Sequence, residues 1–211
     1  GRLRPLPRRR RPRPAETPAV AVRPANPDYV RFVTETVLSM PAAARLGFRV
    51  GRVTPGEVEL LQPWRHELTQ HDGHLQAGVL ASLADLAAGC AAGTLLPAGW
   101  VNMTVDVTLK ILAPASGAAF LAHGRVVHAG LTTTIAAADV WCVPTTDGAT
   151  VLSGAEGDEG FDIDADSGTG RSGSDDPLGP RRPAETMCAT ALITFRNIRR
   201  HPPRPPSRRP S

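Results

Sequence analysis

The sequence has few aromatic residues and few cysteines. Aromatic side chains make up 4% of the chain, and Tyr29 is the only tyrosine. The cysteines are Cys90, Cys142 and Cys188, an odd number without a CxxC pair. This pattern excludes a disulfide framework and a zinc finger. We expect three small, buried side chains in a protein of a reduced compartment.

Long hydrophobic runs are also scarce. The first residues, GRLRPLPRRRRPRPAETP, contain no apolar core of a secretory signal. The longest apolar stretch, residues 77–99, is interrupted by Asp85, several glycines and Pro97. These interruptions favour a buried helix and a loop over a membrane span. We therefore expect a cytoplasmic protein with no membrane partner.

Positive charge is abundant only at the two ends of the chain. The whole sequence has a net charge of +4 and a pI near 9.6. Residues 1–23 contribute +7 and residues 196–211 contribute +6, which leaves −9 for residues 24–195. The basic ends contain no interleaved aromatics, so they predict at most nonspecific binding of nucleic acid.

The 211 residues, 41% of them hydrophobic, suit one folded domain with long appendages. An appendage rich in Pro, Gly or charge buries too little apolar surface to offset the entropy of ordering it. We expect the following order: a disordered Arg/Pro-rich tail over 1–25, a single domain over 26–143 and 186–198, an acidic Gly/Ser/Asp-rich insertion over 144–185 in its last hairpin, and a disordered basic tail over 199–211.

Hydrophobic periodicity predicts an α+β domain. Asn26 or Asp28 caps a first helix that ends before Pro41, and a small, apolar segment over 77–92 predicts a buried helix. Alternation of apolar and polar residues predicts antiparallel strands over 48–53, 57–61, 101–111, 118–128, 131–143 and 186–195. The strand over 101–111 is expected to be half-buried. An antiparallel sheet wrapped around one long central helix would bury such a helix.

Asp85 is the unusual residue of the apolar helix. A carboxylate buried there without a partner would cost several kcal/mol or have a raised pKa. It is therefore either a base or nucleophile beside a cavity, or a hydrogen-bonded structural residue. The helix begins at Gln76-Ala77-Gly78, where free backbone N–H groups can hold an oxyanion.

Three segments together resemble a known family. They are HLQAGVLASLADLAAG from His74, TVDVTLKILAPASG from Thr104 and GRVVHAG from Gly124. They are similar to the PaaI-like acyl-CoA thioesterases of the hotdog superfamily, in which an HGG turn opens the central helix and an acidic residue lies nine positions after the His. This chain keeps that spacing from Gln76 to Asp85.

The resemblance implies a thioesterase site at the interface of a homodimer, or of a dimer of dimers. Asp85 would act as nucleophile or general base. The backbone N–H of Ala77 would bind the thioester oxygen, and Gln70 would orient the water or the carbonyl. Thr104 would come from the facing subunit. The substrate would be an acyl-CoA, and no cofactor is implied.

Two departures from the family bear on substrate binding. Gln76 replaces the His of HGG, either bracing the turn beside Gly78 through its amide or altering the activity. Leu131 stands where related sequences often have a basic residue, which makes Arg125, or the Arg199–Arg200 pair, the candidate contact to a CoA phosphate.

Other functions have weaker support in the sequence. His66, His71 and His74 lack a neighbouring acid or cysteine that would complete a metal site. Asp162, Asp164 and Asp166 resemble the start of a calcium-binding loop. However, Ser167 stands where such a loop needs Gly, and Gly173 stands where it needs the bidentate Glu. The remaining alternative is a hotdog protein that binds acyl-CoA or acyl thioesters without hydrolysing them. The sequence does not select an acyl group.

Overall fold

The computed structural model describes residues 24–144 and 186–200. The expected tails and the acidic insertion lie almost entirely outside these residues, so the proposed domain boundaries stay predictions. Every predicted helix and strand is present. The elements are α1 (Tyr29–Ser39), α2 (Pro41–Leu46), β1 (Arg49–Thr54), β2 (Glu57–Pro63), the short 3-10 helix η1 (His66–Leu68), α3 (Ala77–Gly93), β3 (Trp100–Ile111), β4 (Ala119–Ala129), β5 (Thr133–Val143) and β6 (Thr186–Arg199).

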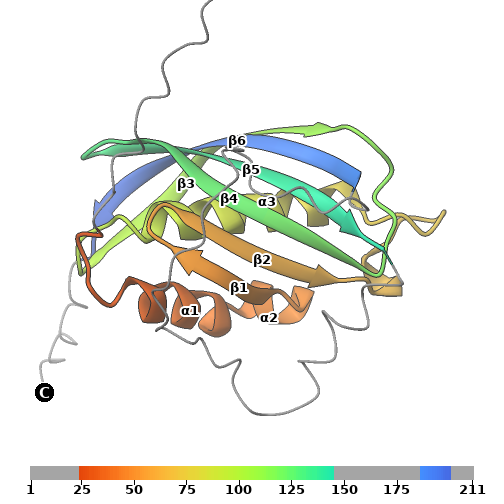
Figure 1. Ribbon diagram of the computed structural model, residues 1–211, viewed down its shortest axis with the longest axis horizontal. Helices are drawn as coiled ribbons and strands as arrows, with labels where there is room; N and C mark the ends of the chain where they lie inside the picture. The colour runs from red at the N-terminus through yellow and green to blue at the C-terminus, as the bar shows by residue number, and fades with distance from the viewer. Residues whose placement is uncertain (1–23, 145–185, 201–211) are drawn as a thin grey trace, which may run out of the picture.

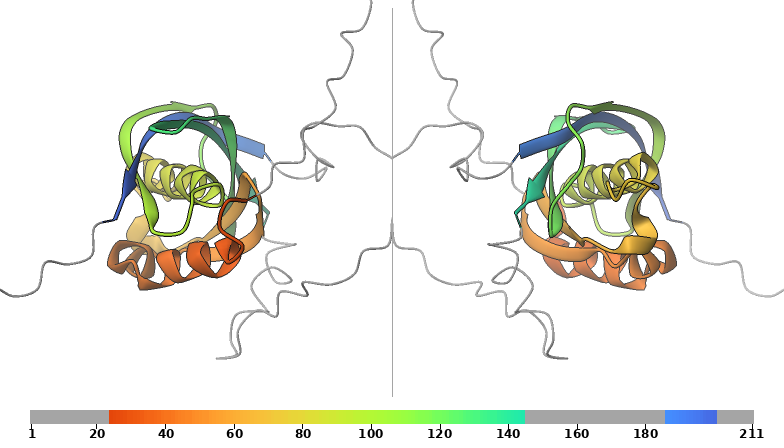
Figure 2. Two further views of the ribbon diagram at one scale, coloured as in Figure 1. Left: turned by 90° about the vertical axis from the view of Figure 1, so that its left-hand side faces the viewer. Right: turned by 90° about the vertical axis from the view of Figure 1, so that its right-hand side faces the viewer.

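The strands form one antiparallel sheet in the order β1-β2-β4-β5-β6-β3. The sheet curves around α3, which is seen along its axis in Figure 2. This arrangement confirms the predicted hotdog architecture. No helix within residues 24–144 and 186–200 is long and apolar enough to cross a membrane.

Small side chains let α3 lie close to the sheet. A Cβ atom added at Gly124 of β4 would stand 2.2 Å from the carbonyl oxygen of Ala87. Only a residue without a side chain fits there, because the backbones of helix and strand touch. Ala84, Ala87 and Ala88 are fully buried on the same helix. Alanine and glycine therefore replace the larger residues that usually separate a helix from a sheet.

Helix α1 lies beside the hairpin of β1 and β2, below the sheet in Figure 1. Val33 and Val37, one turn apart, are its buried residues, as the predicted apolar stripe requires. Asp28 stands at the N-cap position without a side-chain cap. Helix α2 was not predicted. Its six residues are too few to show a helical period.

Strand β3 is confirmed, but the prediction of a half-buried face is wrong for a single chain. Met103, Val105, Val107 and Ile111 are 58, 62, 39 and 50% exposed. Among the described strands, β3 pairs only with β6, so it forms one edge of the sheet. The bulge after Thr104 divides these side chains between two faces: Met103 pairs with exposed Arg196, whereas Val107 and Ile111 pair with buried Ile193 and Ala189 and yet remain exposed themselves.

The last two strands form the predicted pair, with register from Thr133↔Arg196 to Cys142↔Thr186. Strand β6 continues to Arg199, beyond the predicted end at residue 195. The side chain of Asn197 accounts for the extension. Its Nδ2 donates to the carbonyl of Gly130 at 2.9 Å and contacts Thr134 Oγ1 at 3.0 Å, so the end of β6 is fixed to the turn before β5.

Candidate functional site

Asp85 lies in the middle of α3 and faces β3. The hydroxyl of Thr104 donates a hydrogen bond to Asp85 Oδ1 at 2.9 Å. Burial raises the pKa of the Asp85 carboxyl, and the hydrogen bond from Thr104 partly opposes that rise. The carboxylate is half-buried, and Thr104 is its hydrogen-bond partner. Burial and this hydrogen bond together set the pKa of Asp85.

The structure corrects the expected origin of Thr104. The resemblance implied that it comes from the facing subunit, yet it contacts Asp85 of its own chain. A bulge between Thr104 and Asp106 shifts the alternation of β3 at this point. Because one extra residue is inserted, both Thr104 before the bulge and Val107 after it share a face with the buried residues of β6.

Asn102 holds β3 against α3, and sequence reasoning did not identify it. Its Nδ2 donates to the carbonyl oxygen of Gly89 at 2.7 Å. Gly89 follows Asp85 by four residues and thus lies on the same helix face, one turn further on. Asn102 and Thr104 are two residues apart on the strand, so the first contact sets the position of the second. In the sequence, Asn102 is one of several polar residues that alternate with apolar ones.

A pocket of about 360 Å³ opens beside Asp85, between α1, α3 and β3. Thr104 and Asn102 are polar groups at its lining, and Arg200 also borders it. Most of the remaining wall is apolar and includes Phe32, Val33, Gly89, Cys90 and Phe195. Such a pocket can enclose an apolar group whose reactive end lies at the carboxylate.

Cys90 is the other titratable group of this pocket. Burial, together with the nearby charge of Asp85, raises the pKa of its thiol to about 12. The thiol therefore stays protonated at neutral pH and is a poor nucleophile. Asp85 is left as the reactive group that the pocket offers.

The start of α3 is capped by Gln76. Its Oε1 accepts hydrogen bonds from the backbone N–H groups of Gly78 at 2.6 Å and Val79 at 3.2 Å. A Cβ atom at position 78 would lie 2.8 Å from that oxygen, so glycine leaves the space in which the amide folds back. Gln76 thus has the geometry of a brace, one of the two roles considered for it.

Ala77 retains a backbone N–H group for another acceptor. The N–H of Gly78 is engaged by Gln76, whereas that of Ala77 has no partner within the described residues. Ala77 is exposed. At the first turn of a helix, an N–H group with no acceptor and the positive end of the helix dipole favour an oxyanion.

Gln70 lies in the loop that leads into α3. Its backbone N–H donates to His74 at 2.9 Å, and the N–H of Gln76 donates to Leu68 at 3.0 Å. These bonds close the loop beneath the helix start. Gln70 and Ala77 are therefore at the same end of α3, and Gln70 is exposed there.

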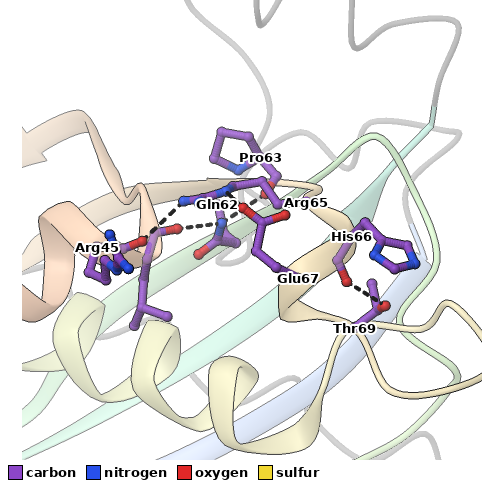
Figure 3. Close-up of polar contacts among 8 residues, drawn as sticks. Arg45, Gln62, Pro63, Arg65, His66, Glu67 and Thr69 are labelled. Atoms are coloured by element: carbon purple, nitrogen blue, oxygen red, sulfur yellow. Dashed lines mark hydrogen bonds and ion pairs between the residues drawn. The ribbon is translucent and has the colours of Figure 1, made fainter.

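Polar contacts fix the segment before this loop, as Figure 3 shows. Gln62 is fully buried, and its Nε2 donates to the carbonyls of Leu46 at 2.9 Å and Pro63 at 2.8 Å. Arg65 Nη1 donates to the carbonyl of Arg45 at 3.0 Å. The end of β2 is thereby tied to α2, which gives the loop a fixed starting point.

The two groups of predicted site residues are separated along α3. Ala77 and Asp85 are eight residues apart. At 1.5 Å per residue, this separation is about 12 Å along the axis. One thioester carbonyl cannot contact both groups of the same chain. Within one chain the predicted site residues thus form two separate groups, Gln70 with Ala77 and Asp85 with Thr104.

Arg125 lies with neither of these two groups, and its contact to a CoA phosphate stays a prediction. Gly124 faces α3, so the side chain of Arg125 lies on the opposite face of the sheet. There its Nη2 is 3.5 Å from Asp139 Oδ2. Arg200, the other candidate, borders the Asp85 pocket.

The three loop histidines are not gathered around a metal position. Among the residues that the structure describes, no group of three or more His, Cys, Asp or Glu side chains has the arrangement of a metal site. His74 Nδ1 is instead 2.6 Å from Ser116 Oγ, across the loop before α3.

Comparisons with known proteins support one family. The model of the thioesterase superfamily matches residues 72–149, a span that includes α3 and strands β3 to β5. A relative from Halobacterium salinarum that is named as an esterase is 33% identical over 96 residues, which cover 43% of this chain and 63% of that relative. The match thus spans less than two thirds of the curated relative.

Solved structures agree on the fold. A thioesterase family protein from Silicibacter pomeroyi has a TM-score of 0.62 and 27% identity, covering 81% of this chain and 98% of that one. The Escherichia coli PaaI protein from the phenylacetic acid degradation operon has a TM-score of 0.57 and 14% identity, covering 82% and 96%. Thioesterase HI1161 from Haemophilus influenzae has a TM-score of 0.55 and 16% identity, covering 78% and 87%. The family match and the strand arrangement around α3 together support the resemblance to PaaI-like hotdog thioesterases that the sequence predicted, and the structure has their hotdog fold.

Proposed function

We propose that this protein hydrolyses the thioester of a small acyl- or aryl-CoA to the free acid and CoA. The observation that carries the proposal is the placement of Asp85. A half-buried carboxylate with a raised pKa lines a mostly apolar pocket and accepts a hydrogen bond from Thr104. Titratable groups perturbed by burial beside a cavity are favoured as catalytic groups.

The chemistry assigned to Asp85 follows from its two oxygens. Thr104 engages Oδ1. The second oxygen is then available either to take a proton from the attacking water or to attack the thioester carbon itself. In both routes the carboxylate form is the active one. In both routes the C–S bond breaks and CoA leaves as a thiolate that takes a proton; the acid forms directly when water attacks, or, when Asp85 attacks, after water hydrolyses the acyl–Asp85 anhydride and regenerates the carboxylate.

The oxyanion donor would come from a second copy of the chain. The oxyanion that develops on a thioester carbonyl next to Asp85 lies too far from Ala77 of the same helix, because the two residues are about 12 Å apart along the axis of α3. Two copies related by a two-fold axis, with their α3 helices antiparallel, would place Ala77 and Gln70 of one copy opposite Asp85 and Thr104 of the other. Each dimer would then contain two equivalent sites.

The edge of the sheet supports such a dimer. Strand β3 has a free edge among the described strands, and Val107 and Ile111, which share one face of it, are 39 and 50% exposed. An edge strand with an apolar face is a template for pairing with another chain. We propose a homodimer as the smallest active assembly, which can pair further into a tetramer.

The pocket limits the substrate to a class. Its apolar wall suits a hydrocarbon or aromatic acyl group, with Phe32 and Val33 of α1 at one side and Gly89 of α3 at the other. Arg200 at the border offers a cation for a phosphate of CoA, since guanidinium pairs well with phosphate oxygens. No residue of the lining selects between aryl and aliphatic groups.

The test is the release of free thiol from a panel of acyl-CoAs by the wild type and Asp85→Asn. We expect turnover by the wild type and a loss of about 10²- to 10⁴-fold in Asp85→Asn, which is the range for one general base. Retained turnover in the variant would disprove the assignment of Asp85. If the wild type bound acyl-CoA without releasing thiol, the protein would instead be an acyl thioester binder.

A further inference from the structure

Two side chains of β3 form hydrogen bonds with α3, and they lie two residues apart. The hydroxyl of Thr104 donates to Asp85 Oδ1 at 2.9 Å, and Asn102 Nδ2 donates to the carbonyl oxygen of Gly89 at 2.7 Å. The first bond holds the proposed catalytic carboxylate. The second joins the strand to the backbone of the helix, one turn further along.

The spacing of the two bonds along the helix matches their spacing along the strand. Asp85 and Gly89 are four residues apart, which is about 6 Å at 1.5 Å per residue. Asn102 and Thr104 are two residues apart, which is about 6.4 to 6.8 Å in an extended strand. Both bonds therefore form in the same alignment of β3 along α3, and together they fix that alignment.

The sheet supports this part of β3 from one side. Among the described strands β3 pairs only with β6, and the register of that pair shifts between Thr104 and Asp106. A bulge disrupts the ladder locally and bends the strand. Thr104 itself is exposed. Pairing with β6 therefore leaves the distance between the Thr104 hydroxyl and α3 to be set by contacts with the helix.

The close approach of α3 at Gly89 brings its carbonyl within reach of a short side chain. A Cβ atom added at Gly89 would stand 3.3 Å from Cε1 of Phe195, the buried residue that pairs with Thr104 across the ladder. A carbonyl oxygen has two lone pairs, so that of Gly89 can accept from Asn102 in addition to its bond within the helix. The Asn102 amide thus acts at the point where the helix lies nearest to this part of the sheet.

We infer that Asn102 is a positioning residue of the proposed active site, which keeps the Thr104 hydroxyl on Asp85 by fixing β3 to Gly89. The inference rests on the proposed role of Asp85 and requires no contact between Asn102 and the reacting atoms. In the intact arrangement the hydroxyl donates to the carboxylate and opposes the rise of its pKa by burial. Without the Asn102 amide the hydroxyl is held less closely, so burial raises the pKa of Asp85 further.

The other ionisable groups that line the Asp85 pocket are Cys90 and Arg200. The pKa of the Cys90 thiol is about 12, so it stays protonated while a carboxyl titrates. The guanidinium of Arg200 keeps its charge over the same range. The lining residues of α1 are uncharged. A changed titration of Asp85 in an Asn102 variant therefore reports on the Thr104 hydrogen bond.

The test is an NMR titration of the Asp85 carboxyl in the whole chain labelled at the aspartate Cγ atoms, with the resonance assigned by Asp85→Asn. Asn102→Leu removes the amide and keeps a side chain of similar size and branching, and we expect the pKa of Asp85 to rise, as it does in Thr104→Val. Combining Asn102→Leu with Thr104→Val should give the pKa of Thr104→Val alone, because both changes remove the same hydrogen bond. Asn102→Ala gives the same comparison if the leucine variant does not fold.

Thr108→Val is the matched control on the same strand. Thr108 pairs with exposed Leu192, so its side chain lies on the face of the sheet that points away from α3. This change removes a hydroxyl as Thr104→Val does, and it should leave the pKa of Asp85 unchanged. A rise in the control equal to that in Asn102→Leu would overturn the specific role of Asn102.

Three further results would overturn the inference: an unchanged pKa of Asp85 in a folded Asn102 variant, a lower pKa, or a rise of equal size with and without the Thr104 hydroxyl. The titration uses no substrate, so its outcome is read whether or not the protein hydrolyses acyl-CoA. Failure of the proposed function is recognised separately, by the thiol-release assay of the wild type and Asp85→Asn.

Discussion

The backbone N–H of Ala77 can be removed with little change to the helix that carries it. Ala77 is the first residue of α3, and Gln76 before it has φ −68° and ψ 138°. Proline is favoured at a first helical position, where its missing N–H serves no intrahelical bond. The residue before a proline prefers the extended region in which Gln76 already lies. Ala77→Pro therefore deletes the proposed oxyanion donor alone.

The expected loss follows from what one such donor contributes. Removing a single oxyanion donor costs about 10²- to 10³-fold in kcat, or about 2.7 to 4 kcal/mol. The assay is thiol release from the best acyl-CoA of the panel, with KM measured separately. Because the bond strengthens as charge develops on the oxygen, the loss is expected mainly in kcat.

A matched variant separates loss of the N–H from a change of side chain. Ala77→Ser keeps the donor and is expected to retain most of the activity. Circular dichroism and thermal unfolding of Ala77→Pro should match those of the wild type. If a folded Ala77→Pro kept kcat within about twofold of the wild type, far short of the effect of one donor, the role of this N–H would be refuted.

Three further predictions follow from individual contacts. Thr104→Val removes the hydrogen bond that lowers the pKa of Asp85; since the carboxylate is the active form, the acidic limb of the kcat/KM profile should move to higher pH, and an unmoved or lower limb would contradict the contact. Gln76→Ala removes the cap of α3 and should cost about 1 kcal/mol in urea unfolding, with Gln76→Asn retaining part of it; equal stability of Gln76→Ala and wild type would refute the brace. Gly124→Ala places a methyl group 2.2 Å from the carbonyl of Ala87 and should lower the free energy of unfolding by at least about 1 to 3 kcal/mol, whereas a change below about 0.5 kcal/mol would mean that α3 and β4 are not in contact there.

Most of the fold could be predicted because its elements have clear periods. The buried helix over residues 77–93 is apolar on nearly all faces, and the strands that flank it alternate in their core-facing residues. The face of β3 could not be predicted correctly. Its alternation is typical of a strand with one buried side. In a single chain, however, Val107 and Ile111 of β3 remain exposed. Alternation indicates that a surface is buried, not which molecule buries it.

The site was predictable in part. Asp85 stood out because a lone carboxylate interrupts an apolar helix, and the structure gives it a pocket and a partner. The placement of Thr104 in the same chain was missed, since the bulge after it has no sequence signal. The side of the sheet on which Arg125 lies could not be predicted, because a basic residue in a strand can face either side and the close fit of Gly124 against the helix decides it.

In the proposed dimer each active site is shared between two chains, and two inactive variants can test this. Asp85→Asn and Ala77→Pro can be coexpressed with different affinity tags, and the mixed dimer purified by both. In a shared site, one of its two sites combines Asp85 of one chain with Ala77 of the other and is intact, so activity should return to about half that of the wild-type dimer. If each chain contained its own complete site, both sites would remain defective, and the mixed dimer would be as inactive as the two parent variants.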